Sequence, residues 1–402
     1  MRNLWIYLFP FLFLPNLGLG VQTPFGKLEL MDFIMFAFLA VTFLARAPAR
    51  RHFAKDLRKY GLLFIVWLLA GCFVMYYFHG YDQKLKVMAF SLLKVGKFSL
   101  YGYTALRLAK LMGDDATRNR FNWSLLFASA IVGLSLIIVL GFEYQRDADT
   151  VSGYKATNLI SAALSIYLSY LSALYFSRVG DRRWQKYAGP FLVLGLVGMA
   201  LSSGRGGWLA LACGIFYYVY KRGVNAKVAV VFYAFMAGAT GLYFYSSNFR
   251  AEVLNTFFPD VSVMQYYGTG IAGINEGGRL MTWANEIKKF PEAPVMGTGF
   301  FNRSPATGLW PDGSHNFWLQ MFLETGLVGG ILVLFLFWKM WVHSGLASAR
   351  ARGLSIPVRS ALVAAFVAGM GGEYFYGSQG LFALLTVYAI AGSLDSNKKI
   401  TS

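Results

Sequence analysis

Charged residues are scarce in this chain of 402 residues. Asp, Glu, Lys and Arg together make up 14% of the sequence, against about 25% in soluble domains. The hydrophobic fraction is correspondingly high, at 56% against roughly 45–50%. This composition excludes an ordinary soluble enzyme and indicates an integral membrane protein.

Cysteine and acidic residues are also few. The two cysteines, Cys72 and Cys213, lie inside apolar runs, which argues against a disulfide framework or a zinc site and favours small core residues. The 19 acidic residues are outnumbered by 37 basic ones, so the formal net charge is +18. Whether such a charge indicates a nucleic-acid partner depends on where the basic residues lie along the chain.

Twelve apolar runs approach the roughly 20 residues that a helix needs to cross a bilayer. They cover residues 4–19, 28–45, 61–79, 87–108, 122–142, 157–177, 187–203, 207–220, 226–245, 315–338, 357–373 and 378–394. The sequence therefore predicts an all-α polytopic membrane protein with about 12 transmembrane helices. We interpret the first run as a retained helix, because no clear small-x-small cleavage site follows it.

Lysines and arginines gather in alternate connections between these runs. With the N-terminus inside, 24 of the 37 lie on the cytoplasmic side, eleven lie outside, and Lys94 and Lys97 fall within the fourth run. The positive-inside rule then predicts that both termini are cytoplasmic. Topology explains the net charge, so we expect no nucleic-acid partner. Lys94 and Lys97 should point into the protein or a polar cleft, either to bind an anionic lipid head group or to pack helices.

One outer connection is far longer than all others. We therefore divide the chain into residues 1–245 with nine helices, an outer loop at 246–314, and residues 315–402 with three helices. Long loops often carry function. No second soluble domain is visible in the sequence.

Two features stand out within the long loop. Leu280–Phe290 is predicted to form a short amphipathic helix, because two glycines precede it and Pro291 and Pro294 follow it. Residues 294–301 are then expected to form a tight turn at the surface.

Two arginines of the outer face are candidate anion ligands. Arg205 lies in a glycine-rich connection too short to leave the membrane surface, where backbone N–H groups can approach a phosphate. Arg279 lies at the start of the predicted loop helix, whose free N–H groups can face the same anion. The alternatives are a snorkelling anchor for Arg205 and a surface salt bridge of Arg279 with Glu276 or Glu286.

His315 opens the tenth apolar run. A histidine at the mouth of a membrane helix is a candidate for proton chemistry, although a hydrogen-bonded helix end is the commoner role. Glu324 follows nine residues later, about 13 Å along a helix, so it cannot act on the same atom. We expect Glu324 to cap or pair internally. Arg303, Lys288 and Lys289 are weaker candidates, for which solvated loop charge is the default.

The residues around His315 form a specific pattern. His315-Asn316, nine residues, Gly326, two residues and Gly329 read H-N-x9-G-x-x-G, and an R-x3-L element begins at Arg205. Together with the twelve runs and the long outer loop, these motifs resemble those of bacterial O-antigen ligases, within the superfamily of O-antigen ligases, polymerases and oligosaccharyltransferases. The resemblance implies a GT-C-like glycosyltransferase architecture in the bacterial inner membrane, with a periplasmic loop and active site.

The resemblance also implies a reaction. Such enzymes transfer a polysaccharide from undecaprenyl diphosphate to a sugar hydroxyl of lipid A-core. We expect His315 to serve as the base for that hydroxyl, and Arg205 and Arg279 to bind the diphosphate. Magnesium or manganese would need carboxylate ligands, which His315, Arg205 and Arg279 do not offer. We therefore expect no metal and no other cofactor. The expected partners are the lipid-linked donor, the lipid A-core acceptor and membrane lipid.

Alternative functions remain within and beyond this superfamily. An O-antigen polymerase would use a second carrier-linked glycan as acceptor, and a protein O-oligosaccharyltransferase would use a protein. The spacing of the His315 pattern favours the ligase. A flippase for lipid-linked oligosaccharides is the non-enzymatic alternative, but transporters favour sites near the bilayer midplane and internal repeats. Here the basic motif residues cluster at the outer surface.

Overall fold

The structure is a computed structural model of the whole chain. It describes residues 20–23, 26–29, 55–78, 84–112, 115–142, 150–151, 154–155, 157–178, 182–201, 205–245, 281–300, 316–345, 352–372, 374–376 and 378–394, with isolated residues 33, 36, 37, 40 and 250. The first predicted run, at 4–19, lies outside the described residues. So do most of the second run and most of the long loop.

Helices make up nearly all of the described chain. They are α3 (Lys55–Phe78), α4 (Lys84–Met112), α5 (Asp115–Phe142), α6 (Thr157–Phe176), α7 (Arg182–Leu201), α8 (Arg205–Arg222), α9 (Ala226–Tyr245), α12 (Met281–Lys289), α13 (Phe317–Gly345), α14 (Arg352–Gly371) and α15 (Ser378–Ser393), with 3-10 turns η3 (Phe290–Glu292) and η5 (Tyr374–Tyr376). The short loop helix predicted over Leu280–Phe290 is confirmed as α12.

Each of the ten apolar runs predicted from residue 61 onward contains a helix. By length and composition, four helical stretches of the described chain can cross a membrane, namely Asp115–Ile138, Ala226–Tyr245, Phe317–Gly345 and Gly353–Gly371. Shorter apolar helices cover Ile160–Phe176 and Ala383–Ser393. The chain is therefore a helical membrane protein. The count of 12 spans and the three-part division of the chain stay predictions.

Several helices are longer than the apolar runs that predicted them. Helix α3 begins at Lys55 instead of residue 61, and α7 begins at Arg182 instead of residue 187. The added turns carry basic residues, which were excluded from the predicted spans because they do not belong in lipid. Long basic side chains can nevertheless extend a helix beyond the hydrocarbon and keep their charges in water.

The expectation of an all-α chain needs a small correction. Two antiparallel hairpins are present, β1 (Gly20–Thr23) with β2 (Gly26–Glu29), and β3 (Thr150–Val151) with β4 (Tyr154–Lys155). Strand β2 includes the first two residues of the run predicted at 28–45. Only two residues separate the paired strands in each hairpin, and these include Pro24 or Gly153, which suit tight turns.

Helix α6 lies at the centre of the bundle. It contacts α5, α7, α8, α14 and α15, and nearly all of its side chains are buried. Its serines, Ser161, Ser165, Ser169 and Ser172, are fully buried. Small residues allow membrane helices to approach closely. Helix α8 uses this at Gly214, where an added Cβ would overlap Ser169.

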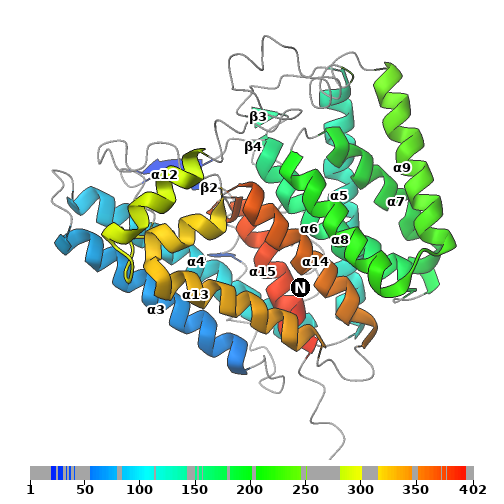
Figure 1. Cartoon of the computed structure of the whole chain (residues 1–402). Coiled ribbons are helices and arrows are strands. Elements are labelled where there is room, and N and C mark those ends of the chain that lie inside the picture. Colours follow the sequence, from blue (N-terminus) through cyan, green and yellow to red (C-terminus); the bar gives the residue numbers. More distant parts are fainter. Residues whose placement is uncertain are drawn as a thin grey trace, which may run out of the picture.

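The other helices form two groups around this centre. In one group, α13 contacts α3, α3 contacts α4, and α4 contacts α15, whereas in the other α5 contacts α7 and α7 contacts α9. Figure 1 shows the first group with α12 on the left and the second on the right. Helix α14 joins the groups, because it packs against α6 and α8 as well as α13.

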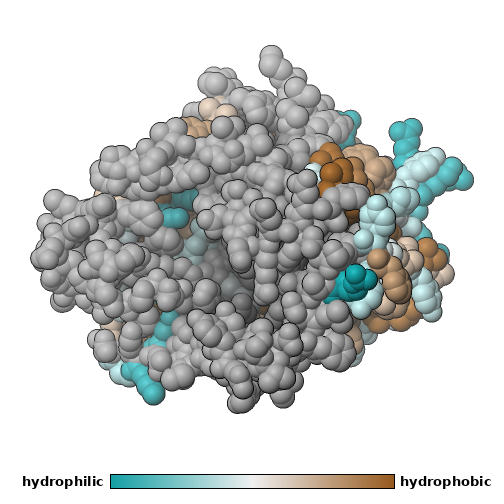
Figure 2. All heavy atoms as spheres, turned by 90° about the horizontal axis from the view of Figure 1, so that it is seen from above, coloured by the Kyte–Doolittle hydropathy of each residue, from teal (hydrophilic) through white to brown (hydrophobic). Residues whose placement is uncertain are grey.

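Large hydrophobic side chains are exposed on the outermost helices. Leu62 and Phe73 on α3 are 65% and 54% exposed, and Val230 and Phe232 on α9 are 67% and 56% exposed. In Figure 2, brown hydrophobic atoms are visible at the edge of the molecule where α7, α8 and α9 lie. Such apolar surface suits helices whose surrounding solvent is lipid.

Candidate active site at the start of helix α13

Asn316 of the H-N-x9-G-x-x-G pattern caps helix α13. Its side-chain Oδ1 accepts hydrogen bonds from the backbone N–H groups of Trp318 and Leu319, each at 3.1 Å. Its own carbonyl accepts the first helical hydrogen bond, from Gln320 N at 2.9 Å. This is the usual way for asparagine to satisfy free N–H groups at a helix start. His315 directly precedes the cap and lies outside the described residues.

Helix α13 is broken at Gly326, the first glycine of the pattern. Gly326 has φ 67° and ψ −172°, values that a residue with a side chain rarely adopts. The backbone of residues 295–297 passes directly against it, so an added Cβ would overlap Val295 and Gly297. Glycine is therefore required here both by its conformation and by the close approach of a second segment.

The segment from Pro294 to Phe300 fills this break. Thr298 N donates to Leu323 O at 2.9 Å, Gly299 N donates to Glu324 O at 3.0 Å, and Leu327 N donates to Pro294 O at 2.8 Å. These contacts satisfy backbone groups that lose their helical partners at the break. The surface turn predicted here is confirmed at Pro294 and Val295, which are exposed, whereas residues 297–300 are buried against α13 and not at the surface as expected.

A buried carboxylate lies one turn before the break. Glu324 is 1% exposed. Its Oε1 accepts a hydrogen bond from Gln320 Nε2 and its Oε2 accepts one from Tyr376 OH, both at 2.7 Å. The predicted internal pairing of Glu324 is confirmed, as buried polar groups require. Tyr376 belongs to η5, so the carboxylate joins α13 to the connection between α14 and α15.

Aromatic rings surround this carboxylate. Tyr376 lies 5.9 Å from Phe300, 5.6 Å from Phe317 and 6.3 Å from Phe98 of α4, measured between ring centroids. Phe317 also packs edge-on against Phe375 at 4.9 Å. Such pairs add rigidity beyond their buried area. They hold α4, the loop end, α13 and η5 together in one water-poor cluster.

Arg205 is placed by the end of helix α14. It is the first residue of α8, and the next residue, Gly206, lies so close to Gly371 that a Cβ added at Gly371 would be 3.2 Å from the Gly206 Cα. Trp318 of α13 contacts the same end of α14, because its Nε1 donates a hydrogen bond to Phe366 O at 2.9 Å. Gly206, which follows Arg205, and Trp318, which follows His315, therefore meet the same six-residue stretch of α14, Phe366–Gly371.

Arg279 lies two residues before α12 and outside the described residues. Helix α12 contacts α13 and leads through η3 into the segment that fills the Gly326 break. Glu286 of α12 is only 5% exposed, and Glu276 lies outside the described residues. The alternative that Arg279 pairs with one of these two carboxylates therefore stays open.

The remaining candidates give a mixed result. Lys94 and Lys97 are half-buried on α4, with Lys97 Nζ 5.9 Å from the ring centroid of Tyr101. Their assignment to lipid binding or to helix packing stays open. Arg303 lies outside the described residues. Tyr376 was not predicted as a site residue, because it is 52 positions from Glu324 and lies on a short turn without periodicity.

The expectation of a metal-free site overlooked one pair of acids. Asp147-Ala148-Asp149 form a D-x-D spacing, a possible source of carboxylate ligands, in the connection between α5 and β3. These residues lie outside the described chain. Among the residues that are described, no group of three His, Cys, Asp or Glu residues is placed to hold a metal ion. Both cysteines are free thiols.

Comparison with known proteins identifies one family. Residues 190–336 match the family model described as O-Antigen ligase, a stretch from α7 into α13 that contains Arg205, Arg279 and His315. A protein of Haemophilus influenzae, described as an uncharacterized protein, is 28% identical over 159 residues. That alignment covers 36% of this chain and 39% of the relative.

Proposed function

This chain is a member of the O-antigen ligase family over residues 190–336, and on that premise we propose that it transfers a glycan from undecaprenyl diphosphate to a sugar hydroxyl of lipid A-core. Family membership supports a glycosyltransferase-like membrane enzyme of lipopolysaccharide assembly. The proposal places the reaction on the periplasmic side of the inner membrane, with both termini in the cytoplasm.

The convergence of three chain segments carries this proposal. Helix α8 begins at Arg205 against Gly371, and α13 begins at Asn316 with Trp318 on the same stretch of α14. The segment after α12 is hydrogen-bonded into the break of α13. Arg205 is the first residue of α8, His315 directly precedes the described start of α13, and Arg279 lies two residues before α12, which leads into the third segment. This arrangement supports the proposal that a base and two cations act together, as an oriented transfer reaction needs.

The proposed chemistry uses these residues in separate roles. His315 takes the proton from the acceptor hydroxyl while the hydroxyl oxygen attacks the anomeric carbon. The bond from that carbon to the diphosphate oxygen breaks, and the electron pair leaves with the diphosphate. Arg205 and Arg279 neutralise the leaving diphosphate through planar guanidinium groups, which bind phosphate oxygens in pairs and stay charged beside lipid.

The buried cluster below would keep this site in shape. Glu324 is too far along α13 to touch the reacting atoms, but it ties α13 to η5 through Tyr376. Gly326 lets the loop end reach α13. We therefore assign Glu324, Tyr376 and Gly326 a positioning role and leave the chemistry to the three residues above.

The test is transfer by the purified protein in liposomes, with undecaprenyl diphosphate-linked glycan as donor and lipid A-core as acceptor. His315→Ala should lower turnover by about 10²–10⁴-fold, the usual value of general-base assistance, while donor binding is retained. Arg205→Lys keeps the charge but loses the paired contacts, so it should weaken donor binding as well. Equal loss of binding and turnover in His315→Ala would make His315 a diphosphate ligand or a structural residue.

Two further arms of this assay separate neighbouring functions. Transfer to a second carrier-linked glycan, but not to lipid A-core, would indicate a polymerase, and donor movement across the bilayer without transfer would indicate a flippase. EDTA should change the rate little. If EDTA abolishes transfer and Mg²⁺ restores it, the variant Asp149→Asn decides whether the D-x-D pair supplies the metal ligands.

A further inference from the structure

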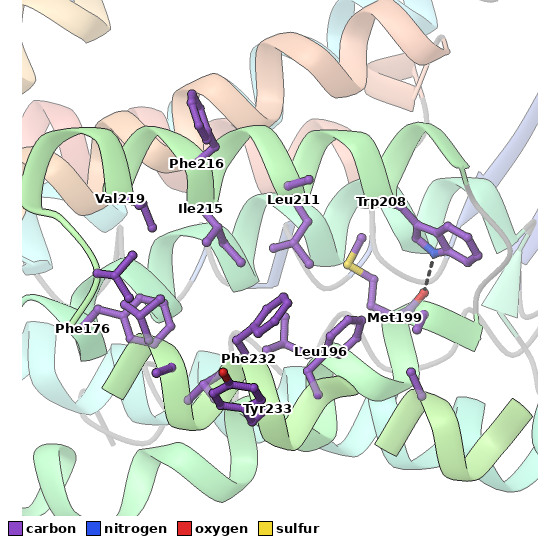
Figure 3. Close-up of a pocket in the computed structure, with 18 residues that line it drawn as sticks. Phe176, Leu196, Met199, Trp208, Leu211, Ile215, Phe216, Val219, Phe232 and Tyr233 are labelled. Carbon is purple, nitrogen blue, oxygen red and sulfur yellow. Dashed lines mark hydrogen bonds between the residues drawn. The ribbon is translucent and has the colours of Figure 1, made fainter. Parts of the chain in front are cut away.

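A long apolar cleft lies between α8 and α9. It has a volume of about 700 Å³, and hydrophobic side chains of α7, α8 and α9 form its walls. Figure 3 shows Leu211, Ile215 and Val219 of α8 on one side, with Leu196 of α7 and Phe232 of α9 facing them. No residue given a role in the proposed reaction lines this cleft.

The cleft starts beside the proposed diphosphate site. Trp208, one turn after Arg205, lines it, and Trp208 Nε1 donates to Met199 O at 3.1 Å, which ties the start of α8 to the end of α7. At its other end the cleft reaches Val224. The fourteen residue steps from Trp208 to the end of α8 at Arg222 correspond to about 21 Å of helix. The cleft therefore runs along most of a bilayer core that is about 30 Å thick.

Helix α9 leaves this space open. Its first turn is fixed, because Asn225 Nδ2 donates to Phe176 O at 3.1 Å and to Tyr218 OH at 3.3 Å. Beyond that turn only 12% of its membrane-spanning window is buried, compared with 50–61% in the other three candidate spans. An apolar space of this size, open to lipid, holds hydrocarbon in preference to water.

The length and position of the cleft favour one kind of hydrocarbon. A phospholipid acyl chain reaches through one leaflet, about half of the 30 Å core, whereas the cleft is about 21 Å long. A polyprenyl chain attached to a diphosphate at Arg205 would enter the cleft directly at Trp208 and is long enough to fill it. We infer that the cleft between α8 and α9 binds the isoprenoid chain of the lipid-linked donor. This inference rests on the proposed function and adds to it a residue set for the carrier lipid.

Donors of different chain length test the inference. Undecaprenyl diphosphate-linked glycan and its farnesyl counterpart are compared in the transfer assay with wild type and with Val219→Trp, which fills the far part of the cleft from α8, about 16 Å from Trp208 and beyond the reach of a farnesyl chain. Because both lipid and cleft are apolar, only packing is lost, so we expect a modest rise in KM of about tenfold for the undecaprenyl donor. The KM for the farnesyl donor and the turnover number should change little.

Matched variants control for folding. Ala237→Trp adds the same side chain to an exposed position of α9 outside the cleft and should leave both KM values unchanged. Ala229→Trp fills the same end of the cleft from α9 and provides the same test if Val219→Trp does not fold. Unchanged discrimination between the two donors in a folded cleft variant would overturn the inference.

A crosslinking experiment tests donor binding in the cleft independently of the proposed transfer reaction. A photoreactive residue at Ile215, which lines the cleft, should capture the undecaprenyl donor, and the same group at Tyr220, outside it, should not. Capture is measured without an acceptor, so it succeeds or fails independently of transfer. Capture of phospholipid alone, or of another segment of this chain, would show that the cleft does not serve the donor.

Discussion

The start of α13 and the cleft between α8 and α9 are built in opposite ways. Around α13, a capped helix start, a broken helix and a buried carboxylate are held by directed hydrogen bonds between four separate parts of the chain. Along α8 and α9, hydrophobic side chains face an open space, and the hydrogen bonds of Trp208 and Asn225 lie at its two ends. Directed contacts fix atoms for chemistry, whereas an apolar space selects a ligand by shape alone. The same kind of substitution should therefore have unequal effects in the two regions.

A glycine pair should show the largest difference. Gly326→Ala forces a side chain into a left-handed conformation, which costs about 1–3 kcal/mol, and places its Cβ into the backbone of Val295 and Gly297. We expect a large loss of stability and loss of transfer. Gly241→Ala in α9 meets nothing within 4 Å and should be neutral or slightly stabilising. Thermal unfolding in detergent and transfer rates measure both, and a stable, active Gly326→Ala protein would refute the broken-helix site.

A tyrosine pair should show an intermediate difference. Tyr376→Phe removes a hydrogen-bond donor from the buried Glu324 carboxylate, and leaving a buried polar group short of a partner costs about 1–3 kcal/mol. Tyr233→Phe alters an exposed residue on the wall of the cleft, where changes stay within about 0.5 kcal/mol.

The positioning role of Tyr376 predicts more than a loss of stability. Transfer by Tyr376→Phe should fall at temperatures at which the protein is still folded, with turnover reduced more than donor binding. Full turnover in a destabilised but folded Tyr376→Phe protein would leave the residue a purely structural role.

An asparagine pair should show the smallest difference. Asn316→Ala and Asn225→Ala each remove a helix cap, which costs about 1 kcal/mol. Asn225→Ala also removes hydrogen bonds to Phe176 O and Tyr218 OH, so its unfolding temperature should fall at least as far as that of Asn316→Ala. Asn316 directly follows His315, whereas Asn225 caps α9 through Val228 N at the opposite end of the cleft. Asn316→Ala should therefore lower transfer more than Asn225→Ala. Equal transfer rates would mean that the cap does not position His315.

Much of the fold could be predicted because membrane spans are local. Runs of apolar residues located ten helices, since a lipid-exposed backbone must satisfy its hydrogen bonds within its own helix. The bounds were less accurate, as at Lys55 and Arg182, because basic residues extend a helix beyond the lipid. Helix α12 was predicted from the glycines before it and the prolines after it. The hairpin at Gly20–Glu29 was missed because apolar content alone does not separate strand from helix.

The site was predicted in part. The pattern singled out Asn316 and Gly326, and the predictions for His315, Arg205 and Arg279 depend on resemblance and await the experiments above. Residues 294–301 were expected at the surface because their sequence resembles an ordinary loop, and Pro294 and Val295 are indeed exposed. Residues 297–300 are buried because the backbone groups freed at Gly326 need partners, and this loop from another part of the chain supplies them. Nothing in the local sequence of residues 294–300 indicates that the backbone groups at Gly326 need these hydrogen-bond partners.

By itself, the sequence determined the class of protein, the helices and the residues worth testing, because composition, apolar runs and short motifs are local properties. Only the tertiary structure decided that Tyr376 serves Glu324, that Gly206 and Trp318 meet the same stretch of α14, and that α9 stands away from α8. Those features depend on segments far apart in the chain. Packing and hydrogen bonding in three dimensions decide which residues become partners. The local sequence around either residue of a pair does not indicate its partner.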